Sequence, residues 1–337
     1  MISVSEIISQ VKGMCRRMKK TFDRNSRKNG PGAKARYALT TFVLLSVVKS
    51  FTGWSSNAFF KKLRDVHDDS LRKKLGLPVN AIPSREDYNY RTHQECFEKC
   101  MRRMFYILRL TLLKHVDTSR VIVDATDIEV KPKYDSTAAW GHCSKGKFYG
   151  YKAHILCTKN GIPLAFRVTK ANEVEVSQFH ELLMEARGLV RSAKKCVYFM
   201  LGDAAYDCEG LYEAVDDLLD ALLLCSPNWR SCKKEIPEGM ALHPSVIEGM
   251  VCTEYRKQAL LYRASTSGKK VYKGRIVIEQ VNSDLKQHMY LNDIHYWQKG
   301  IERVKRHVFC SVFNYCLSIL INIKHNRAPR HVKSCFV

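Results

Sequence analysis

Acidic residues are scarce in this sequence. Its 337 residues include 33 Asp and Glu but 56 Lys and Arg, which gives a formal net charge of +23. A surplus of this size favours polyanionic partners, because binding to phosphates releases their condensed counterions. The excess is concentrated in residues 1–115, which hold 24 Lys and Arg against 9 Asp and Glu. Charge alone does not separate nucleic acid from an anionic membrane surface, or either from a solubilising role.

The sequence also lacks the patterns of a disulfide scaffold. Its first twenty residues do not show the basic-then-apolar order of a signal peptide, and the chain is much longer than such scaffolds. We therefore expect the 13 cysteines to be reduced and mostly buried as small apolar side chains. No Cys-x2-Cys pair occurs, and the closest spacings are Cys96 to Cys100 and Cys310 to Cys316. A structural zinc site remains the alternative.

Long apolar runs are rare, and only residues 308–323 raise the question of a membrane span. The run is short, because crossing a bilayer takes about 20 apolar residues. It also contains four polar residues, Ser311, Asn314, Ser318 and Asn322. We interpret it as a buried helix, and we expect no transmembrane segment elsewhere. No internal repeat or low-complexity tract is evident.

The region from Val4 to about Lys114 has apolar residues at helical spacing. Breaks are expected at residues 29–32, 52–53 and 76–78, and Ser84 is expected to cap a long helix that ends near residue 115. Short helices in a basic segment are typical of helix-turn-helix DNA-binding domains, with residues 56–64 as a candidate groove-entering helix. Any small helical bundle would give the same pattern.

The pattern changes at Arg120. Residues 121–130, 148–158 and 162–171 are rich in β-branched and aromatic residues, and they predict three antiparallel strands. The segments that follow predict an order of β-β-β-α-β-α-β, which indicates an α+β fold. They are a helix at 176–193, a strand at 196–201, a helix at 209–218 and a strand at 221–225.

The last third of the chain is expected to begin irregularly and to end as helix. Residues 226–268 are polar and show no clear period, so we expect an irregular insertion there. A helical region is expected from about Arg275 to the C-terminus, with a break near residues 290–293.

Two aspartates occupy comparable places in this pattern. Asp124 follows the apolar run 121–123, and Asp203 follows the run 197–201 with only Gly202 between. Ligands in open sheets gather at the carboxyl ends of strands, so two such acids converge if their strands are neighbours. Acids also flank strands as ordinary turn or cap residues, which is the alternative for either one alone.

A third acid belongs to a helical pattern near the C-terminus. Tyr272, Arg275, Glu279 and Lys286 fall at offsets 0, 3, 7 and 14. A helix turns about 100° per residue, so these offsets place the four side chains on one face. Apolar side chains occupy the other face at 277, 281 and 285. A solvated face with an ordinary Arg275–Glu279 pair is the alternative.

These residues resemble a known family, the DDE transposases of bacterial and archaeal insertion sequences. Tyr272, Arg275, Glu279 and Lys286 match the Tyr-x2-Arg-x3-Glu-x6-Lys signature of the group called the IS-four type. The segment GYKAHILCTKNGIPLAFRVTKAN is similar to the strand pair after the family's first aspartate, and LGDAAYD is similar to the stretch around its second. The likeness covers about residues 118–325, and the helical N-terminal part resembles the family only loosely.

The resemblance implies a ribonuclease H-like mixed sheet flanked by helices. Asp124, Asp203 and Glu279 would hold two divalent cations, Mg²⁺ or Mn²⁺, because hard oxygen donors suit such ions. Arg275 and Lys286 would bind DNA phosphates, and Tyr272 would contact the DNA backbone.

Other residues compete for these roles. Asp127 and Asp207 lie close to the two aspartates, and we prefer the earlier acid of each pair because it follows its apolar run more directly. Asp207 suits capping of the next helix. Glu173 and Glu175 are further acids whose role stays open. Three basic residues are candidates for contacts along the DNA: Lys145, Lys147 and Lys152. Trp229 is a candidate for stacking on an extruded base.

We therefore expect a basic helical DNA-binding domain at residues 1–115 and a catalytic domain at 116–330. The predicted function is metal-dependent cleavage and strand transfer of double-stranded DNA at the terminal inverted repeats of an insertion sequence, with a homodimer joining the repeats to target DNA. The expected location is the cytoplasm of a prokaryote, at the nucleoid. The alternatives are a nuclease of the same fold without strand transfer and a DNA-binding protein that has lost catalysis.

Overall fold

The chain packs as two compact units in the computed structural model. The helical unit comprises Met1–Leu108, Asp284–His295 and Arg306–Val337, and the sheet unit comprises Arg109–Ser283 and Tyr296–Lys305. The residues that the structure describes are 2–18, 37–78, 82–131, 135–143, 146–228, 243–294 and 299–332.

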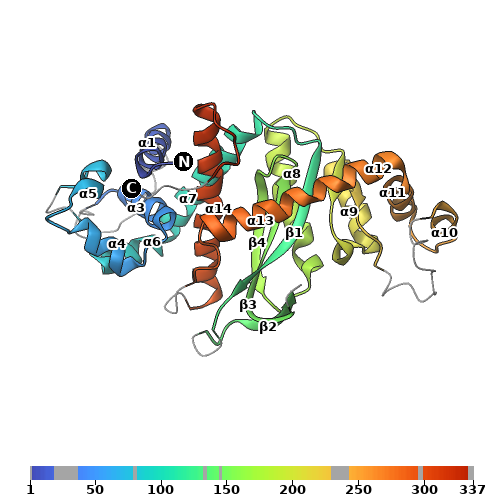
Figure 1. Cartoon of the computed structure of the whole chain (residues 1–337), viewed down its shortest axis with the longest axis horizontal. Helices are drawn as coiled ribbons and strands as arrows, with labels where there is room; N and C mark the ends of the chain where they lie inside the picture. The colour runs from blue at the N-terminus through green and yellow to red at the C-terminus, as the bar shows by residue number, and fades with distance from the viewer. Residues whose placement is uncertain are drawn as a thin grey trace. The chain divides into compact units, whose positions relative to one another are not determined.

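A single six-stranded mixed sheet organises the sheet unit (Figure 1). Its strands are β1 (Arg120–Glu129), β2 (Ala139–Cys143), β3 (Gly146–Thr158), β4 (Pro163–Lys170), β5 (Phe199–Leu201) and β6 (Leu222–Leu224). The order across the sheet is β4-β3-β1-β5-β6, and β2 pairs with the beginning of β3. Strands β1, β3 and β4 are antiparallel neighbours, whereas β5 and β6 run parallel to β1.

This topology is the ribonuclease H-like arrangement expected from the sequence. Each parallel strand is reached through a helix, as parallel neighbours require. Helix α8 (Phe179–Ser192) precedes β5, and α9 (Glu209–Leu219) precedes β6. The antiparallel strands predicted at residues 121–130, 148–158 and 162–171 are present as β1, β3 and β4. Strand β2 was not predicted from the sequence. Only one of its five residues is buried, so its residues show no alternation of apolar and polar side chains.

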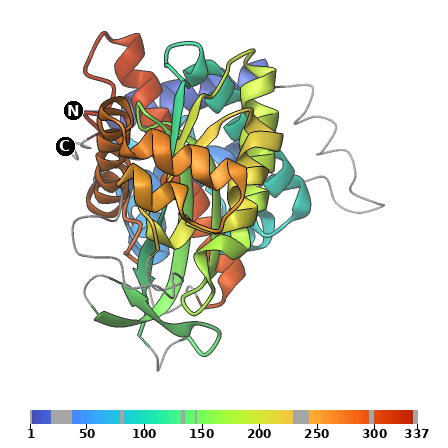
Figure 2. The same ribbon diagram turned by 90° about the vertical axis from the view of Figure 1, so that its right-hand side faces the viewer.

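Helices cover both faces of this sheet. Helix α8 packs against β3 and β4. The segment that follows the insertion leads into α13 (Ile276–His288). In Figure 1, α13 passes in front of β1 whereas α8 lies behind the sheet, and Figure 2 shows the same unit from the side. The part of α13 that crosses β1 brings the C-terminal candidate residues to the face on which the first aspartate stands.

The expectation of an irregular insertion at residues 226–268 is wrong for residues 243–268. Residues 243–268 form α10 (Pro244–Glu248), α11 (Glu254–Ala264) and the start of α12 (Thr266–Tyr272). Local caps start two of these helices, because the Thr253 hydroxyl accepts the N–H of Arg256 and the Ser265 hydroxyl accepts that of Gly268. The buried residues of α11 are Arg256, Ala259 and Leu260. A buried face that includes an arginine gives no clear apolar period, so the sequence pattern did not predict this helix.

The helical unit follows the turn signals of the sequence. Its helices are α1 (Val4–Arg17), α3 (Leu39–Thr52), α4 (Ser56–Leu63), α5 (Ser70–Leu75), α6 (Arg85–Thr92), most of α7 (Glu95–Leu113) and most of α14 (Ile301–Lys324). Gly53 and Gly76 end α3 and α5 in the left-handed conformation that glycine adopts readily. The expected break at residues 29–32 lies outside the described residues.

One long helix from Ser84 to about residue 115 was expected, and this expectation is wrong. Two helices, α6 and α7, occupy the segment. Ser84 does cap α6, because its hydroxyl accepts the N–H of Asp87. The helix then stops after Thr92, whose hydroxyl donates to the carbonyl of Tyr88 at 2.8 Å. Such side-chain bonds compete with the backbone ladder of a helix.

Helix α14 is the one described helix that is long and apolar enough to cross a membrane by length and composition. Most of its apolar window is buried inside the protein. Its buried asparagines bond within the helical unit: Asn314 Nδ2 donates to the carbonyl of Val47 at 3.2 Å, and Asn322 Nδ2 donates to those of Pro329 and His331. These contacts are those of a core helix, as its polar residues predict. The helical unit therefore draws on both ends of the chain.

Packing between α11 and α12 makes a testable prediction at Gly268. A Cβ on this residue would lie 1.8 Å from the carbonyl oxygen of Tyr262, which is backbone and cannot turn away. Gly268→Ala should therefore lower stability by about 1–3 kcal/mol, as overpacking does. Gly188→Ala on α8 is the matched control, because nothing lies within 4 Å of its Cβ position. It should be neutral or stabilising by up to about 1 kcal/mol.

Urea unfolding followed by circular dichroism measures both variants. A Gly268→Ala protein whose unfolding midpoint equals that of the parent would contradict this packing.

Candidate active site

Asp124 and Asp203 are brought together by the register of two neighbouring strands. Strands β1 and β5 run parallel, and their last paired residues are Ile122 and Leu201. Each aspartate stands two residues beyond that pair. Because both strands rise equally per residue, the two side chains leave the sheet at the same level. Asp203 follows the end of β5 as expected, whereas Asp124 lies inside β1, which continues to Glu129 along β3.

Two side chains from the α13 segment contact Asp124. Asn282 Nδ2 donates to its Oδ2 at 3.0 Å, and a guanidinium nitrogen of Arg275 lies 3.9 Å from its Oδ1. Burial and the charge of Asp203 raise the pKa of Asp124 to about 7, against the opposing effect of Arg275. The negative charge of Asp203 therefore lies close enough to disfavour ionisation of Asp124, and the charge of Arg275 does not fully offset it.

The structure gives the two alternative acids, Asp127 and Asp207, surroundings that differ from those of Asp124 and Asp203. Asp127 is three residues from Asp124 on the same strand, so its side chain points to the opposite face of the sheet. Asp207 is wholly buried in an ion pair with Arg256, at 2.7 Å between Oδ2 and Nη2. The expectation that Asp207 caps a helix is wrong, because the residue at the N-terminal cap of α9 is Cys208 and it makes no side-chain cap.

Tyr272, Arg275 and Glu279 come from three consecutive helical segments and not from one continuous helix. Tyr272 ends α12, Arg275 ends the 3₁₀ turn η3 (Lys273–Arg275), and Glu279 lies in the first turn of α13. A 3₁₀ turn advances about 120° per residue, so the common face predicted from a uniform helix applies only within α13. The buried residues of that helix include Ile278, Val281 and Leu285, and Val277 is only half-buried.

The hydroxyl of Tyr272 is engaged by the protein itself. It donates to the carbonyl oxygen of Gly202 at 3.0 Å and lies 3.0 Å from the hydroxyl of Ser226. The guanidinium of Arg263 sits 3.7 Å from the centre of its ring. Because Gly202 directly precedes Asp203, these contacts tie Tyr272 to the loop of the second aspartate.

Arg275 lies between two acids. Its Nη2 donates to Oε1 of Glu279 at 3.0 Å, and its Nη1 is the nitrogen 3.9 Å from Asp124. The Glu279 side chain is 55% exposed. Among the described residues, no three His, Cys, Asp or Glu side chains are grouped as they would be around one metal ion. The structure thus brings Asp124 and Asp203 together directly and connects Glu279 to Asp124 through Arg275.

The other candidates lie in different places. Lys286 stands seven residues beyond Glu279 on α13, where the chain has passed into the helical unit. Trp229 and Lys145 lie outside the described residues. Lys147 is exposed on β3, and Lys152 forms an ion pair with Glu175 at 3.2 Å.

Glu175 is a further acid near the pair, and its role was left open by the sequence. It begins the 3₁₀ turn η1 (Glu175–Gln178), which lies against the turn η2 (Ala204–Tyr206) that follows Asp203. Its charge contributes to the raised pKa of Asp124. Tyr206 is buried beside these acids, and its hydroxyl makes no hydrogen bond. The sequence signal was an acid just before a helix, which is common and therefore uninformative by itself. Glu173 is half-buried two residues earlier.

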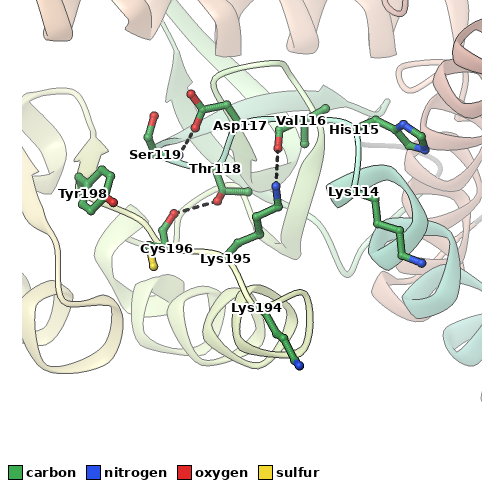
Figure 3. A pocket seen from close by; sticks show the side chains of 10 residues that line it. All are labelled: Lys114, His115, Val116, Asp117, Thr118, Ser119, Lys194, Lys195, Cys196 and Tyr198. Carbon is green, nitrogen blue, oxygen red and sulfur yellow. Dashed lines mark hydrogen bonds between the residues drawn. The ribbon is translucent and has the colours of Figure 1, made fainter.

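A hollow of about 550 Å³ lies elsewhere in the sheet unit (Figure 3). It is lined by residues 114–119, which precede β1, and by Lys194, Lys195, Cys196 and Tyr198, which precede β5. The hollow is therefore at the amino ends of the strands, whereas Asp124 and Asp203 stand beyond the carboxyl end of β5. None of the candidate acids lines it.

The donors at the aspartate pair fit a hard divalent cation. Carboxylate oxygens are the ligands that Mg²⁺ and Mn²⁺ prefer, and the unpaired tyrosine hydroxyl adds another oxygen at the same place. A bound cation would also supply the positive charge that Asp124 and Asp203 lack, which lowers the pKa of nearby acids. Asp124 and Asp203 would hold such an ion.

The raised pKa of Asp124 predicts how stability depends on pH. The folded protein keeps Asp124 protonated up to about pH 7, whereas the unfolded chain releases this proton near pH 4. Stability in EDTA should therefore fall as pH rises from 4 to 8, by on the order of a few kcal/mol at about 1.4 kcal/mol per pKa unit.

Asp124→Asn should remove this part of the pH dependence, because the amide does not ionise. Mg²⁺ at pH 8 should stabilise the parent much more than the variant. Unfolding midpoints in urea at pH 5 and pH 8, with EDTA or with Mg²⁺, give the comparison. Parallel pH profiles of parent and variant in EDTA would show that Asp124 is not in this environment.

Comparison with known proteins gives one match that bears on identity. The transposase DDE domain family matches residues 116–316, a segment that contains Asp124, Asp203 and Glu279. Curated proteins give no match. The crystal structure of the Mos1 Strand Transfer Complex aligns at 13% identity over 83% of this chain and 87% of that chain, with a TM-score of 0.22, too low to carry any argument. Since the family match spans more than half of the sequence, the chain belongs to the transposase DDE domain family.

Proposed function

We propose that this protein cleaves DNA at the terminal inverted repeats of an insertion sequence of the IS-four type and joins the released 3′-hydroxyl ends to target DNA. Its family and its positive charge both support a DNA substrate. The observation that carries the proposal is the strand register that sets Asp124 and Asp203 side by side, with Arg275 reaching from Asp124 to Glu279.

In this proposal Asp124, Asp203 and Glu279 hold two divalent cations, Mg²⁺ or Mn²⁺. When bound, the cations would supply Lewis-acid activation of an attacking oxygen and charge stabilisation of the leaving oxygen in an in-line phosphoryl transfer. The chain then needs no nucleophile of its own, which agrees with a site built from carboxylates. Asn282 orients Asp124 through its amide, and this bond leaves Oδ1 of the carboxylate available.

Arg275 has two roles in this proposal. Without DNA its guanidinium offsets part of the negative charge of Asp124 and Glu279. A planar guanidinium also binds phosphate with two parallel hydrogen bonds, so a DNA phosphate can take the place of Glu279 as its partner. Lys286 binds phosphate as a point charge on the same helix, α13.

The helical unit supplies DNA binding in this proposal. Helix α4 carries Lys61 and Lys62 in its last turn, and α5 carries a run of three basic residues, Arg72, Lys73 and Lys74. Basic short helices of this kind favour contacts with the phosphate backbone. Two copies of the chain would bring two terminal repeats together as a homodimer.

Loss of any of the three acids should abolish the chemistry and leave DNA binding intact. Asp124→Asn, Asp203→Asn and Glu279→Gln should each slow metal-dependent cleavage on the order of a hundredfold or more, because each removes a ligand of the ions. Asp217→Asn is the matched control, since Asp217 is an exposed acid of α9. It should cleave as the parent does.

The substrate is duplex DNA that carries the inverted repeats found beside the reading frame, incubated with Mg²⁺ or Mn²⁺. Denaturing gels measure nicking, and covalent transfer of a labelled 3′ end into a plasmid measures joining. Nicking without transfer would identify a nuclease. Salt-dependent binding without cleavage, unchanged in Glu279→Gln, would overturn the proposal in favour of a DNA-binding protein that lacks catalysis.

A further inference from the structure

A buried ion pair fixes the loop that follows Asp203. Asp207 lies four residues after that aspartate, and its carboxylate is fully buried. The guanidinium of Arg256 on α11 donates two parallel hydrogen bonds to this carboxylate, Nε to Oδ1 at 2.9 Å and Nη2 to Oδ2 at 2.7 Å. This fork geometry fixes the direction as well as the distance between the partners. Helix α11 is thereby attached to the loop of the second aspartate.

The remaining hydrogen-bonding capacity of Asp207 is also used. The hydroxyl of Tyr212 donates to Oδ1 and the backbone N–H of Asn228 donates to Oδ2, both at 2.7 Å. Arg256 also donates through Nη1 to Glu209 at 2.8 Å, and Glu209 accepts the N–H and hydroxyl of Thr253. The cluster thus joins the loop, α9, the segment after β6 and the start of α11 at one point.

A second tether holds the other end of the same loop. Tyr272, at the end of α12, donates to the carbonyl of Gly202, and Arg263 of α11 packs on its ring. Arg256 and Arg263 are seven residues apart on one helix, so both face the same side. Helix α11 therefore contacts the loop directly at Asp207 and through Tyr272 at Gly202. Asp203 lies between these two points.

The tethers also link the loop to the third acid. Tyr272 is followed without a break by η3 and α13, which carry Arg275 and Glu279. A rigid α11 therefore sets the distance between the Asp203 loop and the segment that presents Glu279. Sites that bind metal through residues distant in the sequence depend on such supporting contacts, because the ligands must be held in place before the ion arrives.

Stability alone does not account for a pair of this kind. Taking two charges out of water costs about as much as their attraction returns, so buried ion pairs often add little to the free energy of folding. Their contribution is geometric, because the partners are satisfied in only one arrangement.

We propose that Arg256, acting through Asp207, is a positioning residue that fixes the Asp203 loop relative to the segment carrying Tyr272, Arg275 and Glu279. The inference rests on the proposed function, because it assumes that Asp203 binds a divalent cation. Arg256 touches neither the substrate nor the ion in this proposal. It acts by holding the carboxylate of Asp203 where an ion can be shared.

Direct binding of Mn²⁺ tests the inference without relying on activity. Free Mn²⁺ is measured by electron paramagnetic resonance in titrations of the full chain without DNA. Arg256→Lys keeps the positive charge but loses the two parallel hydrogen bonds of the guanidinium. Tyr272→Phe keeps the ring but loses the hydrogen bond to the carbonyl of Gly202. Both should weaken Mn²⁺ binding about ten- to a hundredfold, the range found when residues supporting metal ligands are changed. Asp203→Asn should weaken it at least as much.

Lys257→Gln is the matched control, because it changes one basic residue on the same helix that has no place in the cluster. Its Mn²⁺ affinity should equal that of the parent. Circular dichroism and the urea midpoint establish that each variant is folded. If Arg256→Lys fails to fold, Tyr272→Phe decides the outcome. DNA affinity in EDTA should be unchanged in Arg256→Lys, since Arg256 does not contact DNA.

The results separate this inference from the proposed function. Weakened Mn²⁺ binding in the folded variants, with Lys257→Gln unchanged, supports the positioning role even if the parent does not transfer DNA strands. Parental Mn²⁺ affinity in folded Arg256→Lys overturns it whatever the result for Tyr272→Phe, as does a parent that binds no Mn²⁺. Loss of DNA affinity with Mn²⁺ binding retained also overturns it, because Arg256 would then be a DNA contact.

Discussion

The parallel pairing of β1 with β5 is the constraint on which the site depends. Three residue pairs join these strands, and beyond the last of them the chains diverge, with β1 continuing along β3 and β5 turning into a loop. Asp124 and Asp203 each stand two residues beyond the last of these pairs. A shift of one residue in this register would turn one carboxylate to the other face of the sheet. Strand pairing therefore sets the chemistry as well as the core.

Sequence reasoning recovered the elements that have strong local signals. The antiparallel strands, the two crossover helices and the breaks at Gly53 and Gly76 all follow from apolar periodicity and turn residues. It failed where packing overrides that period. Helix α11 buries Arg256 in place of an apolar residue, so its pattern resembles an irregular polar segment. Strand β2 is mostly exposed and likewise carries no alternation.

The sequence could nominate the candidate acids but not their arrangement. Asp124, Asp203 and Glu279 could be selected by their positions after apolar runs and within a spaced motif, and the family match covers all three. Their surroundings could not be selected in this way. Asn282, Glu175 and Tyr206 come from separate segments, and only the folded chain shows that they lie beside the aspartates. The interruption at η3 and the partners of Tyr272 likewise depend on tertiary contacts.

The composition of the helical unit has a consequence for how the chain matures during synthesis. Its first helices emerge early from the ribosome, but the stretch of α14 that packs with them begins only at Arg306. Residues 109–283 are synthesised before that stretch. Most of the sheet is therefore able to form while the N-terminal helices still lack the packing that α14 provides. Domains generally fold as units during translation. A chain interrupted before α14 would therefore leave apolar helices such as α3 without the packing that α14 supplies.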